Sequence, residues 1–198
     1  DGEIYRMYYR GGGETTEEVT CLAESRDGIT WTRPVLRLHE FRGSKENNIV
    51  LRGRRKAYWE SHNFAPFIDA NPAARPEERY KALALGRYLL PDGEDEKALV
   101  ALVSPDGIRW RRLREEAVIT AGSFDSQNVA FWDAARKRYT CYLRAGRDGV
   151  RSVRRATSKS AVSRTFVRAT RERVEAELGR RLDSLDLAAL MLDGIVVK

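Results

Sequence analysis

The 198-residue sequence contains 42% hydrophobic residues, so it is long and apolar enough to bury a substantial core. Its formal net charge of +7 would suit a nucleic-acid partner, but the arginines are interspersed with carboxylates rather than gathered in one run, which makes charge a weak indicator. Cys21 and Cys141 are too few and too far apart for a disulfide framework or a metal cluster, and no apolar run reaches the roughly 18 residues of a membrane span. We therefore expect a folded protein without a membrane partner.

A strand and a turn recur along the chain. Similar predicted strands begin at three tyrosines, with the sequences YRMYYRG from Tyr5, YKALALG from Tyr80 and YTCYLRAG from Tyr139. The first two are followed by Ser-x-Asp-Gly-Ile-x-Trp, at residues 25–31 and 104–110. Asp-Gly favours a tight turn because glycine accepts positive φ, and the tryptophan can fold back over the hairpin. Each copy therefore predicts a strand, a turn and a strand.

A further apolar strand precedes the tyrosine strand in two copies. HNFAPFID, at residues 62–69, resembles SQNVAFWD, at residues 126–133. Each unit then holds about four short antiparallel strands, which is typical of a β-propeller blade, with a β-sandwich as the alternative. We predict a mainly β chain with an incomplete propeller of about two to three blades over residues 1–159. Two to three blades are too few to close a ring, so we expect further blades outside these residues. The chain begins inside a predicted strand and shows no leader, so its compartment stays open.

Polar residues precede the two apolar strands, where they would face the axis of a propeller. They are Glu60, His62 and Asn63 in one unit and Asp125, Gln127 and Asn128 in the next, and the segment KENNIVL adds Asn47 and Asn48. Carboxylates from different blades would converge on one pocket, and glycoside hydrolysis uses such a pair. We predict Glu60 and Asp125 as catalytic residues and the others as substrate-binding residues, the alternative being that they only cap turns. No cofactor is predicted for the propeller, because His62 has no partner at metal-ligand spacing.

The segments ESHNFAPFID, ERYKALAL, SPDGIRW and FDSQNVAFWD follow one another in this order. Together they resemble the five-bladed propeller proteins of the arabinanase, levansucrase and invertase superfamily, over residues 1–159. The resemblance implies a funnel-shaped site at the propeller axis where carboxylates hydrolyse an oligosaccharide or another glycoside. The catalytic segments Asn-Asp-Pro-Asn, Arg-Asp-Pro and Glu-Cys of that superfamily match no stretch of this chain. A noncatalytic sugar-binding propeller is therefore an alternative.

The repeat stops near Lys159. After Ser158 the turn pattern predicts aspartate at 160 and tryptophan at 164, where the chain has Ser160 and Arg164. Apolar residues from Val162 onward follow the helical period of about 3.6. We predict a basic helix, followed by a short buried strand within SLDLAALMLDGIVVK, as a second region over residues 160–198.

Residues 156–198 resemble the mutator-type insertion-sequence transposases. In that family the segment equivalent to LDGIVVK opens a ribonuclease-H-like core, and Asp193 falls at the first of three carboxylates that hold Mg²⁺ in a complete core. Arg164, Arg168 and Arg171 share a helix face that could contact DNA phosphates, with a solvated face as the alternative. We expect a glycoside-hydrolase-like propeller fused to a truncated transposase, inactive as either enzyme. A transposase fragment with an unrelated leader is the alternative.

Overall fold

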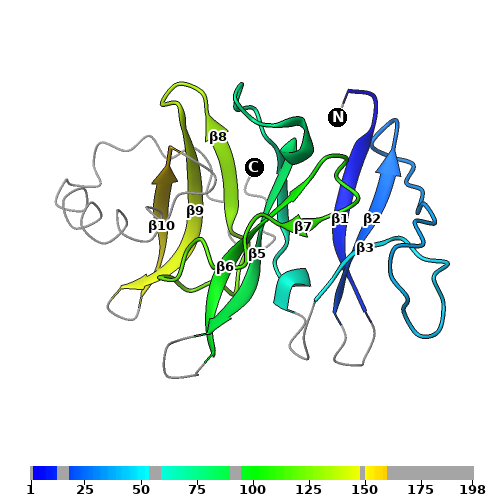
Figure 1. Cartoon of the computed structure of the whole chain (residues 1–198), viewed down its shortest axis with the longest axis horizontal. Helices are drawn as coiled ribbons and strands as arrows, with labels where there is room; N and C mark the ends of the chain where they lie inside the picture. The colour runs from blue at the N-terminus through cyan, green and yellow to red at the C-terminus, as the bar shows by residue number, and fades with distance from the viewer. Residues whose placement is uncertain (1, 13–17, 54–58, 90–94, 148–149, 160–198) are drawn as a thin grey trace.

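The computed structural model describes residues 2–12, 18–53, 59–89, 95–147 and 150–159, which form three antiparallel sheets in chain order (Figure 1). The first sheet contains β1 (Tyr5–Gly11), β2 (Val19–Ser25) and β3 (Ile49–Arg52). The second contains β4 (Ala65–Ile68), β5 (Tyr80–Leu89), β6 (Asp95–Ser104) and β7 (Arg111–Arg112). The third contains β8 (Val129–Asp133), β9 (Arg138–Arg147) and β10 (Val150–Ser158). Short 3-10 turns, η1 (Trp59–Ser61) and η2 (Pro76–Glu78), precede β4 and β5.

The predicted mainly β fold is confirmed for the described residues. β1, β5 and β9 contain the predicted tyrosine strands, and each pairs with the strand that follows it. In every pair a tyrosine lies opposite a serine: Tyr5 and Ser25, Tyr80 and Ser104, and Tyr139 and Ser158. β4 and β8 pair with the tyrosine strand of their own sheet, so both lie at the same edge of the repeat. The predicted helix and strand of residues 160–198 lie outside the described residues.

Apolar side chains bury both faces of the second sheet. Along β5, Ala82 and Ala84 belong to the core shared with the first sheet, whereas Leu83 and Leu85 belong to the core shared with the third. Other members include Leu22, Val50, Val100 and Leu102 toward the first sheet, and Leu99, Ile119, Cys141 and Leu143 toward the third. Full burial of each such leucine, isoleucine or valine contributes roughly 1.5–3 kcal/mol. The three sheets are therefore stacked face to face.

A buried polar cluster also joins the second sheet to the third. Tyr139 Oη donates to Asp69 Oδ2 at 2.7 Å, and Lys81 Nζ lies 2.8 Å from the same oxygen. Asn71 Nδ2 donates to Tyr139 Oη at 3.0 Å. Buried charges are tolerated when they are paired and hydrogen-bonded, and the Lys81–Asp69 pair meets both conditions. The cluster therefore fixes β9 against the end of β4.

The predicted Ser-x-Asp-Gly turn forms twice with the same hydrogen bonds. The serine Oγ accepts from the glycine N–H, at 2.8 Å for Gly28 and at 2.9 Å for Gly107. The aspartate Oδ1 accepts from two following backbone N–H groups, at 2.8 and 2.7 Å for Asp27 and at 2.8 Å for both in Asp106. Gly28 and Gly107 have φ values of 74° and 72°, in the left-handed region that suits glycine. The sequence repeat is therefore also a repeat of local structure.

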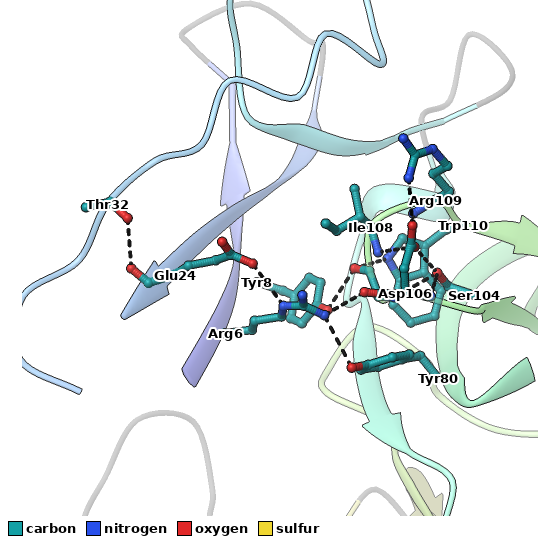
Figure 2. Close-up of polar contacts among 11 residues, drawn as sticks. Arg6, Tyr8, Glu24, Thr32, Tyr80, Ser104, Asp106, Ile108, Arg109 and Trp110 are labelled. Atoms are coloured by element: carbon teal, nitrogen blue, oxygen red, sulfur yellow. Dashed lines mark hydrogen bonds and ion pairs between the residues drawn. The ribbon is translucent and has the colours of Figure 1, made fainter. Parts of the chain in front are cut away.

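The two turns differ in what packs against them. β1 reaches the second turn, where Arg6 Nη1 donates to the Asp106 carbonyl at 2.6 Å and Tyr8 Oη donates to the Gly107 carbonyl at 2.8 Å (Figure 2). Arg6 Nη1 also donates to Tyr80 Oη at 3.3 Å. We call this contact between β1 and the turn of the second sheet the turn–strand joint. It gives the stacking of the first two sheets a fixed register.

Aromatic rings surround the turn–strand joint. The ring centroids of Phe64 and Trp110 are 4.9 Å apart in an edge-to-face arrangement, and those of Tyr8 and Phe64 are 5.6 Å apart. Trp110 Nε1 donates to the Gly107 carbonyl at 3.0 Å, which confirms that this tryptophan folds back over its hairpin. Aromatic pairs of this kind contribute about 0.5–1.5 kcal/mol beyond their buried area. The joint thus combines directional hydrogen bonds with apolar packing.

The two turn glycines form a matched pair for testing the joint. A Cβ at Gly107 would lie 2.7 Å from Tyr8 Oη, whereas a Cβ at Gly28 would meet no described atom within 4 Å apart from its chain neighbours. Alanine at positive φ costs about 1–2 kcal/mol at either position. We expect Gly28→Ala to lower the free energy of unfolding by that amount and Gly107→Ala to lower it further by displacing the Tyr8 and Arg6 side chains from the turn. Urea denaturation of dilute protein measures both losses, and equal losses would contradict the joint.

The lowered pKa of Asp106 leads us to expect a loss of stability in acid. Burial raises the pKa of its carboxyl, but hydrogen bonds from the backbone of Arg109 and Ile108 outweigh burial and lower the pKa to about 2. Because an unfolded aspartate titrates near a pKa of about 3.9, the stability from this carboxylate is complete above about pH 4 and is lost as the pH falls toward 2. We expect Asp106→Asn to flatten the unfolding free energy across that window, as measured by melts at a series of pH values. If the unfolding free energy of Asp106→Asn fell as steeply between about pH 4 and pH 2 as that of the parent chain, Asp106 would not be the source of the acid sensitivity.

Candidate functional site

Asn63 connects the three sheets just before β4. Its φ of 53° is left-handed, a conformation that asparagine tolerates better than most residues. Its Nδ2 donates to the Phe124 carbonyl at 3.2 Å, in the segment leading to β8, and its Oδ1 accepts from Arg10 Nη2 of β1 at 3.4 Å. The segments that lead into β4 and β8 are therefore in contact. Such a contact is needed if polar residues of both segments are to line one site.

Asp125 is an accessible carboxylate at this meeting point. Its side chain is 53% exposed, and its Oδ1 lies 2.5 Å from Arg144 Nη1 of β9. Ion pairs with this much exposure contribute at most about 1 kcal/mol, so the arginine mainly orients the carboxylate. Gln127, also exposed, follows in the same segment. Two of the predicted site residues thus reach solvent here.

Asn128 serves the fold of the segment before β8. It is fully buried, and its Nδ2 donates to the carbonyls of Ser126 and Phe124 at 2.8 and 3.3 Å. Its Oδ1 has no hydrogen-bond partner within the described part of the chain. The side chain therefore holds the loop that presents Asp125 and does not itself reach solvent.

Glu60 lies in η1 and is also withdrawn from solvent. Its side chain is 7% exposed, and its Oε1 accepts from Arg112 Nε at 2.6 Å, with Arg112 Nη2 in contact with the same oxygen. Arg112 belongs to β7, at the opposite edge of the second sheet from β4. The Glu60 carboxylate is thus occupied by a buried ion pair. Glu60 and Asp125 do not form the accessible pair of carboxylates that the sequence predicts.

A different carboxylate, Glu18, lies beside the predicted residue His62. His62 Nδ1 is 3.1 Å from both carboxylate oxygens of Glu18, and Arg10 Nε is 3.0 Å from Glu18 Oε1. Arg10 also contacts Asn63, so this cluster adjoins the segment before β4. Glu18, Arg10 and Arg144 could not be selected from the sequence, because tertiary structure brings them beside the predicted residues. Packing of the first sheet on the second places Arg10 and Glu18, and the pairing of β8 with β9 places Arg144.

Asn47 and Asn48 lie elsewhere than the sequence predicts. They precede β3, which occupies the edge of the first sheet opposite to the side taken by β4 and β8 in their own sheets. Asn48 Nδ2 donates to the Leu22 carbonyl at 2.7 Å and to Tyr9 Oη at 2.8 Å, and Asn47 Nδ2 donates to the His39 carbonyl at 2.8 Å. They therefore lie at the other edge of the repeat from the segments before β4 and β8, where they hold the first sheet together.

The predicted DNA-binding and metal-binding residues lie outside the described ranges. They are Arg164, Arg168, Arg171 and Asp193. Among the residues that the structure describes, no three His, Cys, Asp or Glu side chains are grouped to hold a metal ion. In the same residues no helix is long and apolar enough to span a membrane. The transposase-like part of the sequence stays a prediction.

Comparison of the sequence with protein-family models and with curated proteins finds no match. Among solved structures, the chain is similar to a GH32 beta-fructofuranosidase from Bombyx mori, with a TM-score of 0.52, and to a sucrose-6-phosphate hydrolase from Lactobacillus gasseri, with a TM-score of 0.51. Each match has 11% sequence identity and covers 80% of this chain and 30% of the solved chain. This likeness confirms the predicted incomplete propeller at the level of the fold.

Truncation of Glu60 tests whether this carboxylate is structural. Removing one partner of a buried ion pair costs about 3–5 kcal/mol, and we expect Glu60→Ala to cost about 3 kcal/mol because Arg112 keeps its hydrogen bond to the Glu115 carbonyl. Glu46→Ala, which breaks an exposed pair with Arg37, should cost less than about 1 kcal/mol. Urea denaturation compares the two variants. Small and equal losses would show that Glu60 is available for another role.

Proposed function

We propose that this chain forms part of a carbohydrate-binding channel in a glycoside-hydrolase-like propeller, with Asp125 facing the bound glycoside. The observation that carries the proposal is an exposed carboxylate, oriented by Arg144, at the segment where the second and third sheets meet. The fold likeness to part of two sugar hydrolases supports it.

The side chains around Asp125 suit recognition of hydroxyl groups. An ionised carboxylate accepts hydrogen bonds from adjacent sugar hydroxyls, and the exposed amide of Gln127 can both donate and accept. Arg144 restricts the rotamers of Asp125, so less side-chain entropy is lost on binding. The site therefore has the donors and acceptors for an oligosaccharide.

The described residues favour binding without turnover. Hydrolysis of a glycosidic bond uses two carboxylates on either side of it. Glu60, the predicted partner of Asp125, is instead buried against Arg112. Glu18 is engaged by Arg10 and His62. We therefore propose that the chain on its own binds a glycoside and leaves it intact.

Titration of the purified chain with sucrose and with a short fructose oligosaccharide, followed by calorimetry, tests the proposal. A hydrogen bond to a charged group contributes about 1.5–3 kcal/mol, so Asp125→Asn should weaken binding roughly 10- to 100-fold. Glu46→Gln, on the outer part of the first sheet, should bind as the parent chain does. Absence of binding to either sugar, or equal binding by Asp125→Asn, would overturn the proposal. If the parent chain released free sugar and Asp125→Asn did not, the chain would be an active hydrolase and the proposal of binding without turnover would be wrong.

A further inference from the structure

The arginine beside the candidate site has a counterpart in the first sheet. Arg144 of β9 and Arg10 of β1 each lie five residues after the serine-paired tyrosine of their strand, so they occupy the same position of the repeat. In the second sheet this position is Leu85, which is buried and whose backbone N–H donates to the His62 carbonyl at 3.1 Å. The repeat therefore supplies one arginine from each of the sheets that flank the second sheet.

Each of these arginines holds a carboxylate near Asn63. Arg10 Nε lies 3.0 Å from Glu18 Oε1, and Arg144 pairs with Asp125. Asn63 Oδ1 accepts from Arg10 Nη2 at 3.4 Å, and Asn63 Nδ2 donates at 3.2 Å to the backbone carbonyl directly before Asp125. One side-chain amide therefore links the two arginine–carboxylate pairs, which lie on opposite sides of it.

The Arg10–Glu18 pair is accessible, unlike the buried pair of Glu60 and Arg112. The side chains of Arg10 and Glu18 are 55% and 25% exposed, whereas that of Glu60 is 7% exposed. Within the described ranges, Glu18 Oε2 contacts only Nδ1 of His62, at 3.1 Å, so it can accept a further hydrogen bond. A second carboxylate can therefore receive a hydroxyl group of a ligand.

Packing of the first sheet on η1 does not depend on these charges. Thr20 Oγ1 donates to the Ser61 carbonyl at 3.2 Å, and Ser61 Oγ donates to the Glu18 carbonyl at 2.7 Å. Thr20 and Ser61 are both buried, and both hydrogen bonds end on backbone carbonyls. An ion pair as exposed as Arg10–Glu18 adds little to such packing. A role in the fold alone does not account for the two charges.

We infer that the Arg10–Glu18 pair is a second carbohydrate subsite, and that the ligand is an uncharged oligosaccharide with sugar units on both sides of Asn63. This inference rests on the proposed binding function of Asp125. In each pair the carboxylate accepts from a sugar hydroxyl and the guanidinium donates to a neighbouring sugar oxygen, so each pair holds one unit. The charges of the two pairs cancel, which favours a neutral sugar over one that carries a carboxylate or a phosphate group.

The dependence of affinity on the length of the sugar tests the inference. The purified chain is titrated with a fructose tetrasaccharide by calorimetry, and the weaker binding of fructose is measured by displacement of the tetrasaccharide. The parent chain should bind the tetrasaccharide roughly 10- to 100-fold more tightly than fructose, which is the contribution of one hydrogen bond to a charged group at the second subsite. Glu18→Gln and Arg10→Gln should each lower this ratio of affinities toward one.

Glu46→Gln is the matched control, because it removes the carboxylate of another exposed pair, Arg37–Glu46, and it should keep the parent ratio. Glu18→Gln preserves the size of the side chain, and the circular dichroism of each variant checks that it is folded. If Asp125→Asn weakens the binding of both sugars while Glu18→Gln and Arg10→Gln keep the parent ratio, the second subsite is wrong and the proposed function stands. If neither sugar binds the parent chain, both are wrong.

Discussion

The hydrogen bonds from Arg6 and Tyr8 to the turn at Asp106 and Gly107 decide how the first two sheets fit together. Apolar burial supplies most of the stabilisation, but it is non-directional and would tolerate a sliding of one sheet over another. The turn carbonyls are held in place because the side chains of Ser104 and Asp106 hydrogen-bond the backbone that follows them. A rigid turn therefore becomes a docking element, and the stacking acquires one register.

The candidate site depends on the same stacking. Asn63 reaches the segment before β8, and Tyr139 reaches Asp69 at the other end of β4, so the third sheet is fixed to the second at both ends of that strand. This arrangement leaves Asp125 exposed with Arg144 beside it. Glu60, by contrast, is buried and forms an ion pair with Arg112. Polar residues that look equivalent in the sequence are thus divided between the fold and the surface.

Local signals were predictable and tertiary partnerships were not. The turn at residues 104–110 was predictable because aspartate, glycine and serine satisfy its hydrogen bonds within a few residues. The burial of Glu60 was not, because its partner Arg112 belongs to a strand at the far edge of the sheet. The position of Asn48 could not be predicted for a related reason. A polar residue before an apolar strand gives the same sequence pattern at either edge of a sheet, and only the pairing of β3 with β2 shows which edge it occupies.

Native-state hydrogen exchange offers the most direct test that one of two identical turns is docked. The amides of Ile29 and Thr30 and those of Ile108 and Arg109 donate to the same kind of aspartate oxygen at nearly the same distances, so local hydrogen bonding protects both pairs alike. In dilute protein, the account predicts clearly slower exchange at residues 108 and 109, where opening must also break the contact with β1. Equal exchange rates in the two turns would contradict it.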